Sequence, residues 1–247
     1  MSENEVVFSI ARHAAWAPGV TSPERWEAWA REPWPLAGDG EPKGEPKVSA
    51  MPAMLRRRAG FLGRMALEVA YECAGAQTDV PTVFCSRHGE VARAIELLSD
   101  LARGEPLSPT AFGLAVHNAS AGLFSIARAD RANHVALAGG SATVEHAVIE
   151  ACGMLADGAP RVLLVACDAP LPDLFAAFED CDEQPWAFAW LMTAADAKPL
   201  RLSWQGAQAG ETASTPGGLD VLRFQLGATP ALVRDTGAMR WTWSRDA

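Results

Sequence analysis

The residues best placed to do chemistry lie in the stretch ALAGGSATVEHAVIEA, which covers residues 136–151. Small residues typical of a strand end run here through two glycines into an amphipathic helix pattern, so the chain turns sharply between two elements. Ser141 stands at that turn. A side chain in this position is exposed at the end of the strand and faces the positive end of the helix dipole, which stabilises a developing anion. Ser141 is therefore a candidate nucleophile.

A serine hydroxyl attacks an ester or thioester only when a general base and an oxyanion hole lie close to it. Two histidines are candidates for the base: His117 on an incoming helix, and His146, five residues after Ser141. A working dyad would make the protein a serine-dependent acyltransferase or thioesterase. Lone histidines at such positions more often pack against other side chains or cap a helix. We therefore keep the enzyme as an alternative.

The cysteines do not point to a metal site. They are five in number, without a Cys-x-x-Cys pair and without a histidine at ligand spacing, which argues against zinc or disulfide frameworks. We expect no metal and no cofactor.

Composition limits the classes of protein that this chain can belong to. With 247 residues, 49% hydrophobic and 21% charged, we expect one globular domain over residues 1–247. The formal charge of −9 disfavours binding to nucleic acid, which requires a positive surface. Apolar runs are too short for a membrane span, and the opening SENE lacks a signal-peptide pattern, so we expect a cytoplasmic protein.

Strand and helix patterns alternate along the chain, which predicts a layered α/β fold with a mixed, largely parallel sheet. The predicted strands are 6–10, 81–86, 134–138, 162–166, 187–193, 221–226 and an edge strand at 240–244. The predicted helices are a short one after Ser22, a long one over 55–73, and others over 90–103, 118–128 and 143–156.

A family resemblance is carried by the order and spacing of several short motifs. They are Ser108-Pro109, Asn118, Ala121-Gly122, the turn at Ser141, Gly158 and the apolar strand 162–166. The order and spacing of these motifs resemble those in the N-terminal half of a β-ketoacyl synthase. They are most similar to those of the short ketosynthase-like chain-length-factor proteins of aryl polyene pathways. The best-matched core is 81–193, and the resemblance implies a truncated thiolase-like half-fold.

The chain departs from that family at the nucleophile. Active synthases place a cysteine within Thr-Ala-Cys-x-Ser-Gly, whereas this chain has Gly139-Gly140-Ser141-Ala142-Thr143-Val144. The two histidines that the second half of a synthase supplies also have no counterpart, because no histidine follows His146. The resemblance therefore implies a subunit that is not catalytic alone.

The resemblance also implies partners and contact residues. The chain is expected to pair with a full-length ketosynthase as a heterodimer in polyketide or fatty acid biosynthesis, and to help set the length of the acyl or polyene chain. Phe112, Asn118 and Ser141 would line the acyl tunnel. The dimer interface would be the strand Asn133, His134, Val135, Ala136, Leu137, Ala138, Gly139 and Gly140, and an acyl carrier protein could contact Arg56, Arg57, Arg58 and Arg64. A stabilising scaffold without influence on product length is a further alternative.

Overall fold

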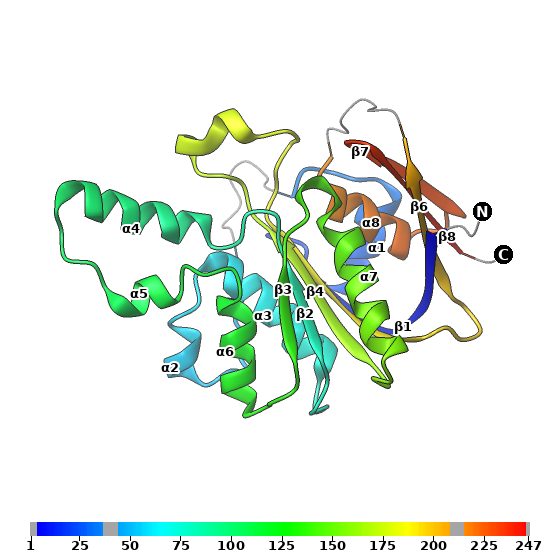
Figure 1. Ribbon diagram of the computed structural model, residues 1–247, viewed down its shortest axis with the longest axis horizontal. Helices are drawn as coiled ribbons and strands as arrows, with labels where there is room; N and C mark the ends of the chain where they lie inside the picture. Colours follow the sequence, from blue (N-terminus) through cyan, green and yellow to red (C-terminus); the bar gives the residue numbers. More distant parts are fainter. Residues whose placement is uncertain (1–3, 37–43, 208–214, 246–247) are drawn as a thin grey trace.

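A mixed sheet of eight strands forms the centre of the protein in the computed structural model, which describes residues 4–36, 44–207 and 215–245 (Figure 1). The strand order is β3-β2-β4-β5-β1-β6-β8-β7, so β3 and β7 are the two edges. The strands are β1 (Asn4–Trp16), β2 (Thr82–Cys85), β3 (His134–Leu137), β4 (Val162–Asp168), β5 (Trp186–Ala194), β6 (Leu200–Gly206), β7 (Ala231–Thr236) and β8 (Met239–Arg245).

Parallel pairing is confined to one end of this sheet. Strands β3, β2 and β4 are parallel, whereas every pair from β4 onward is antiparallel. The mixed sheet is thus confirmed, but the expectation that it is largely parallel is wrong. The reason is that the first strand, β1, lies between β5 and β6, and β7 and β8 form a hairpin. The pairings of β1 join segments that are distant in the sequence and leave no local signal.

Helices cover both faces of the sheet. They are α1 (Pro23–Arg31), α2 (Ala53–Arg56), α3 (Phe61–Ala74), α4 (Val91–Arg103), α5 (Pro109–Gly113), α6 (Ala119–Arg128), α7 (Thr143–Ala156) and α8 (Gly217–Leu226), with 3-10 turns η1 (Gly140–Ala142) and η2 (Asp173–Phe178). Helices α3 and α6 pack in the apolar core of one face. Helices α1, α7 and α8 pack in the other, where aromatic side chains of β5 and β8 fill the space between sheet and helices. None of the helices in the described ranges is long and apolar enough to cross a membrane.

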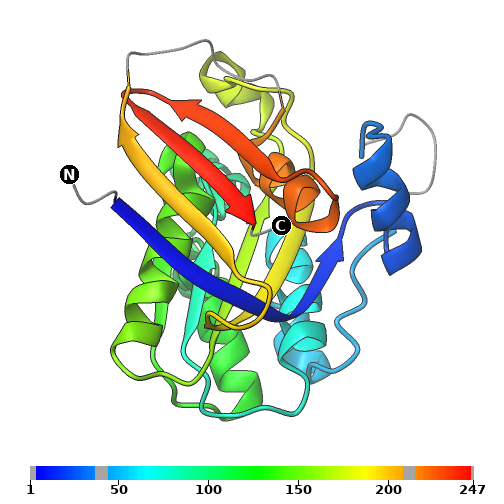
Figure 2. The same ribbon diagram turned by 90° about the vertical axis from the view of Figure 1, so that its right-hand side faces the viewer.

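The antiparallel end of the sheet curls over α7 (Figure 2). Trp241 and Trp243 of β8 belong to the same buried cluster as Val144 and Val148 of α7. The ring of Trp241 also lies edge-on to the ring of His146, with centroids 5.2 Å apart. The first turns of helix α7 therefore pack against both the central strands and β8, while His146, Glu150 and Gly153 remain exposed.

Helices α4 and α5 form an arm that projects from the body, at the left of Figure 1. No residue of either helix is buried in this chain. Nevertheless, apolar side chains are frequent on the arm: Leu98, Leu101, Leu107 and Phe112 are all exposed. An exposed apolar surface of this kind is typical of a protein contact.

Three predicted elements differ from the structure. The strand expected at the edge, 240–244, is β8, which pairs with β6 and β7 and is therefore not an edge. The long helix expected over 55–73 is two helices, α2 and α3, because the chain leaves the helix after Arg56 and restarts at the extended Gly60. The strand expected over 221–226 is the end of helix α8, which begins after Pro216. A short apolar run suits either element, and here burial against α1 and α7 favours the helix.

Candidate functional site

The turn that carries Ser141 is built from backbone constraints. After β3, Gly140 adopts φ +59°, which suits a residue without Cβ. The hydroxyl of Thr143 accepts a hydrogen bond from Gly139 N at 3.0 Å and donates one to Gly140 O at 2.7 Å. Together these contacts close the turn and place Ser141 within η1, immediately before the N-terminus of α7. The predicted position of Ser141 is therefore correct.

No histidine serves as a base for Ser141 among the described residues. The Nδ1 atom of His146 lies 2.8 Å from Ala142 O, and Nε2 of His117 lies 3.1 Å from Leu137 O. Both rings are thus engaged by backbone carbonyls, and no hydrogen bond joins either to Ser141. The geometry offers no dyad of the kind that a serine acyltransferase or thioesterase requires.

The backbone of Ser141 is held by a buried cluster instead. Nη2 of Arg234, in β7, donates to Ser141 O at 3.0 Å, and Nη1 of the same guanidinium forms an ion pair with Glu145 of α7. Nε1 of Trp243 donates to Glu145 Oε1 at 3.3 Å. The side chains of Glu145 and Arg234 are 0% and 7% exposed. This cluster fastens the β7–β8 hairpin to the start of α7.

A polar pocket of about 510 Å³ lies beside this turn. Its wall includes Ser141, Arg87, Cys181, Asp220 and Arg234. Burial raises the pKa of Asp220 to about 6, although the neighbouring arginines oppose the shift. Burial also raises the pKa of Cys181 to about 11, so its thiol is protonated near neutral pH and is a poor nucleophile.

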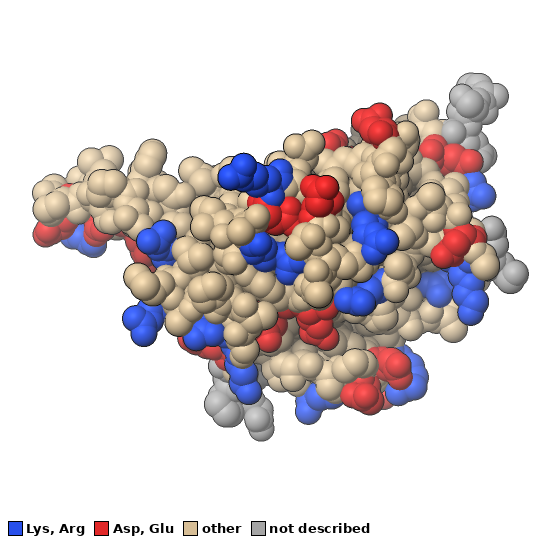
Figure 3. Space-filling view, turned by 90° about the horizontal axis from the view of Figure 1, so that it is seen from below, with Lys and Arg blue, Asp and Glu red and all other residues tan. Residues whose placement is uncertain are grey.

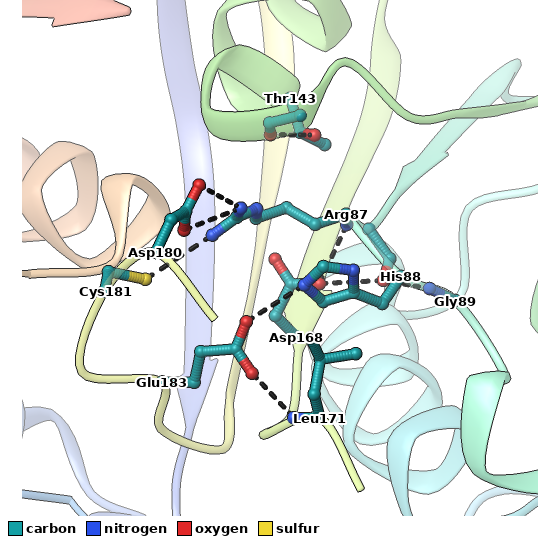
Figure 4. Close-up of polar contacts among 11 residues, drawn as sticks. Arg87, His88, Gly89, Thr143, Asp168, Leu171, Asp180, Cys181 and Glu183 are labelled. Carbon is teal, nitrogen blue, oxygen red and sulfur yellow. Dashed lines mark hydrogen bonds and ion pairs between the residues drawn. The ribbon is translucent and has the colours of Figure 1, made fainter. Parts of the chain in front are cut away.

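A second polar cluster occupies the carboxyl ends of β2 and β4 (Figure 4). Asp168 Oδ1 accepts hydrogen bonds from Ser86 Oγ and from the backbone N of Arg87, both at 2.8 Å. The Arg87 guanidinium forms two hydrogen bonds of 2.9 Å with Asp180. Burial raises the pKa of Asp168 to about 6. This cluster was not predicted from the sequence. The sequence does show two polar segments that each follow a buried strand. It does not show that these segments, 82 residues apart, contact each other.

The predicted tunnel residues do not share one pocket of this chain. Phe112 lies on α5 and is 67% exposed, and Asn118 is the exposed N-cap residue of α6. Ser141 lines the polar pocket, whose wall contains neither of them. Phe112 instead faces solvent on the arm, and Asn118 faces solvent at the start of α6, next to the arm.

The predicted interface strand is an edge of the sheet. Asn133 O and Leu137 O accept hydrogen bonds from β2. Since successive residues of a strand direct their backbone groups to opposite sides, His134 and Ala136 present theirs to the open edge. That edge bonds no other strand in the described part of the chain.

The four predicted arginines lie around α2 and the start of α3. Arg57 and Arg58 are exposed. Arg56 donates to Val48 O at 3.2 Å, and Arg64 forms an ion pair with Glu45 at 2.7 Å. On the face of the molecule shown in Figure 3, cationic and anionic side chains are interspersed. Of the four arginines, Arg57 and Arg58 are thus the two most open to a partner.

Comparison with protein families gives one decisive match. The family described as "Beta-ketoacyl synthase, N-terminal domain" matches residues 26–244. The chain belongs to this family. The match extends well beyond 81–193, the core in which the resemblance is expected to be best.

The chain is also similar to several solved structures of ketosynthases and their complexes. One chain of a ketosynthase (ApeO) in complex with its chain length factor (ApeC) from Xenorhabdus doucetiae is 27% identical, with a TM-score of 0.85 and coverage of 97% of this chain and 100% of that chain. A β-ketoacyl synthase from Burkholderia phymatum is 13% identical, with a TM-score of 0.56 and coverage of 91% and 69%. The ishigamide ketosynthase/chain length factor is 15% identical, with a TM-score of 0.52 and coverage of 78% and 59%.

These similarities confirm the predicted α/β class and the thiolase-like half-fold. The two more distant structures support the fold alone, and the chain spans 69% and 59% of their lengths. No match was found among the curated proteins.

Proposed function

We propose that this protein is a ketosynthase-like subunit that pairs with an active β-ketoacyl synthase and helps set the length of the acyl or polyene chain. The proposal rests on the match to one chain of a ketosynthase–chain length factor complex. This match covers 100% of that chain and 97% of the present one. The proposed setting is a cytoplasmic aryl polyene type pathway, in which the two proteins form a heterodimer.

The free edge of β3 is the proposed pairing surface. It offers the backbone groups of His134 and Ala136 to a second strand, and an unpaired edge is a liability that pairing removes. An antiparallel partner strand would extend the sheet across the interface. The predicted interface, Asn133 to Gly140, then includes β3 and the glycines that lead into the Ser141 turn.

The arm supplies the proposed means of setting chain length. Its apolar side chains are largely uncovered by this chain, and Phe112 on α5 is 67% exposed. In a complex these side chains would be buried against the ketosynthase, where Phe112, with Asn118 at the base of the arm, would close the end of the acyl tunnel. Ser141 lies in the wall of the separate polar pocket and would be a small lining residue without a chemical role.

Among the described residues, neither His117 nor His146 forms a hydrogen bond with Ser141, which supports a non-catalytic role. We expect the isolated chain to show no decarboxylation or condensation of malonyl and acyl carrier thioesters above a control without enzyme. Ser141→Cys alone should not restore activity, because nucleophile and oxyanion stabilisers act as a unit.

Co-expression with the ketosynthase of the same gene cluster tests the proposal. Ala136→Pro removes a donor from the open edge of β3 and should weaken the complex, whereas the pairing of β3 with β2 is retained because Ala136 faces away from it. Phe112→Ala should lengthen the products detected by mass spectrometry while the complex still assembles. Assembly with an unchanged product distribution would favour a scaffold, and normal assembly of the Ala136→Pro variant would place the interface elsewhere.

A further inference from the structure

The connection between β4 and β5 presents apolar side chains to solvent. Within it, η2 has the sequence Asp-Leu-Phe-Ala-Ala-Phe, and none of its residues is buried. Leu174 and Phe178 are 71% and 70% exposed. Phe175 packs edge-on against Phe178, with ring centroids 5.9 Å apart. We call Leu174, Phe175 and Phe178 the η2 patch.

The segment that carries the η2 patch is fastened to the body by polar contacts on both sides. After the patch, Asp180 forms two hydrogen bonds with the Arg87 guanidinium, and Glu183 forms an ion pair of 2.9 Å with His88 (Figure 4). Before the patch, Leu171 N donates to the second Glu183 oxygen at 2.6 Å. The exposed apolar side chains therefore lie on an anchored turn. Less conformational entropy is lost when such a preorganised surface binds a partner.

The charges around the η2 patch define the chemistry of its partner. Asp173, Glu179 and Asp182 are exposed, and none of them forms an ion pair within the described ranges. An apolar centre with a charged rim is the usual anatomy of a protein interface. The negative rim favours a partner with lysine or arginine around its apolar contact and disfavours an acidic one such as a carrier protein.

The η2 patch and the arm leave the sheet at the same edge. Helix α4 follows β2 and η2 follows β4, and these strands are parallel, so both connections start from their carboxyl ends. Figure 1 shows η2 above α4 on that side of the molecule. A partner that covers the arm is thus in a position to reach the η2 patch as well.

We propose that the η2 patch is a second docking surface for the ketosynthase, which receives an apolar segment flanked by lysine or arginine. This inference rests on the proposed function. It adds a contact outside β3 and the arm, and it makes the strength of the complex depend on the anchored connection between β4 and β5.

Binding kinetics of the full-length chain with the co-encoded ketosynthase, measured by surface plasmon resonance, test the inference. The double variant Leu174→Ser/Phe178→Ser should raise Kd at least tenfold, mainly through faster dissociation. Met54→Ser on α2 is the matched control, because Met54 is also exposed but α2 lies on the far side of the arm from η2 (Figure 1), and it should leave Kd unchanged. The double variant should fold normally because both side chains are exposed, and circular dichroism checks this.

A charge reversal provides an independent measurement. Asp173→Lys/Asp182→Lys should slow association severalfold and reduce its dependence on salt. If both double variants bind with wild-type kinetics, the η2 patch is not a docking surface, whereas the proposed function stands as long as Ala136→Pro weakens the complex. If the wild-type chain binds no ketosynthase, both proposals are overturned.

Discussion

Replacing Arg234 with methionine should loosen the C-terminal hairpin from α7. The variant removes the ion pair with Glu145 and the 3.0 Å hydrogen bond to Ser141 O, while methionine keeps much of the arginine's apolar volume. Glu145 is 0% exposed and would remain as an uncompensated charge. Breaking a buried pair from one side typically costs about 3–5 kcal/mol, so we expect a loss of that size in the free energy of unfolding.

Urea denaturation followed by tryptophan fluorescence measures this loss, since Trp241 and Trp243 lie buried on the same hairpin. Arg240→Met is the matched control. It removes an arginine of β8 whose ion pair with Asp235 lies at the surface, and it should change the free energy of unfolding very little.

The double variant Glu145→Leu/Arg234→Met should recover most of the loss, because it removes the fully buried Glu145 charge together with its partner. Asp220, whose contact with Arg234 Nε is 3.8 Å long, keeps Arg223 nearby. If Arg234→Met is no less stable than Arg240→Met, the buried cluster does not hold the hairpin to α7, and the reasoning is wrong.

Three further variants test the account at other positions. Ser141→Ala should leave product length unchanged and cost no more than one modest hydrogen bond, about 0.5–1.5 kcal/mol; loss of product from an assembled complex would show that Ser141 is chemically active. Burial raises the pKa of Asp168 from 3.8 to about 6, so the folded state favours the protonated carboxyl. The stability that this protonated form contributes is fully present below pH 3.8 and is lost as the pH rises through 6. Asp168→Asn keeps an acceptor oxygen and should therefore gain on the order of 3 kcal/mol relative to the wild type between pH 4 and pH 8, as measured by denaturation at each pH; parallel pH profiles would contradict this. Arg57→Glu/Arg58→Glu should weaken carrier-protein binding severalfold without affecting assembly, and unchanged titration calorimetry would exclude these arginines from that contact.

Local patterns were sufficient to predict the elements around Ser141. Helix α7 begins and ends at the predicted residues, since small residues and glycines precede it and a regular apolar periodicity runs through it. The parallel strands β2 and β4 were also predicted, because apolar runs are typical of strands buried on both faces. Strand β3 was predicted as well, although it is an edge strand that is only partly buried.

Long-range arrangements could not be predicted in the same way. Strands β6 and β7 were not predicted, and the position of β1 between β5 and β6 depends on residues nearly 190 positions apart, such as Phe8 and Ala194. The clusters around Arg87 and Arg234 likewise join residues more than 80 positions apart. Their side chains are ordinary charged residues in the sequence, and only the fold makes them buried partners.

The native mass of the complex purified after co-expression with its ketosynthase tests the central claim most directly. The account predicts a single species that contains one copy of this 26.2 kDa chain and one ketosynthase. Recovery of the ketosynthase only as a dimer of itself, with this chain eluting alone, would contradict it.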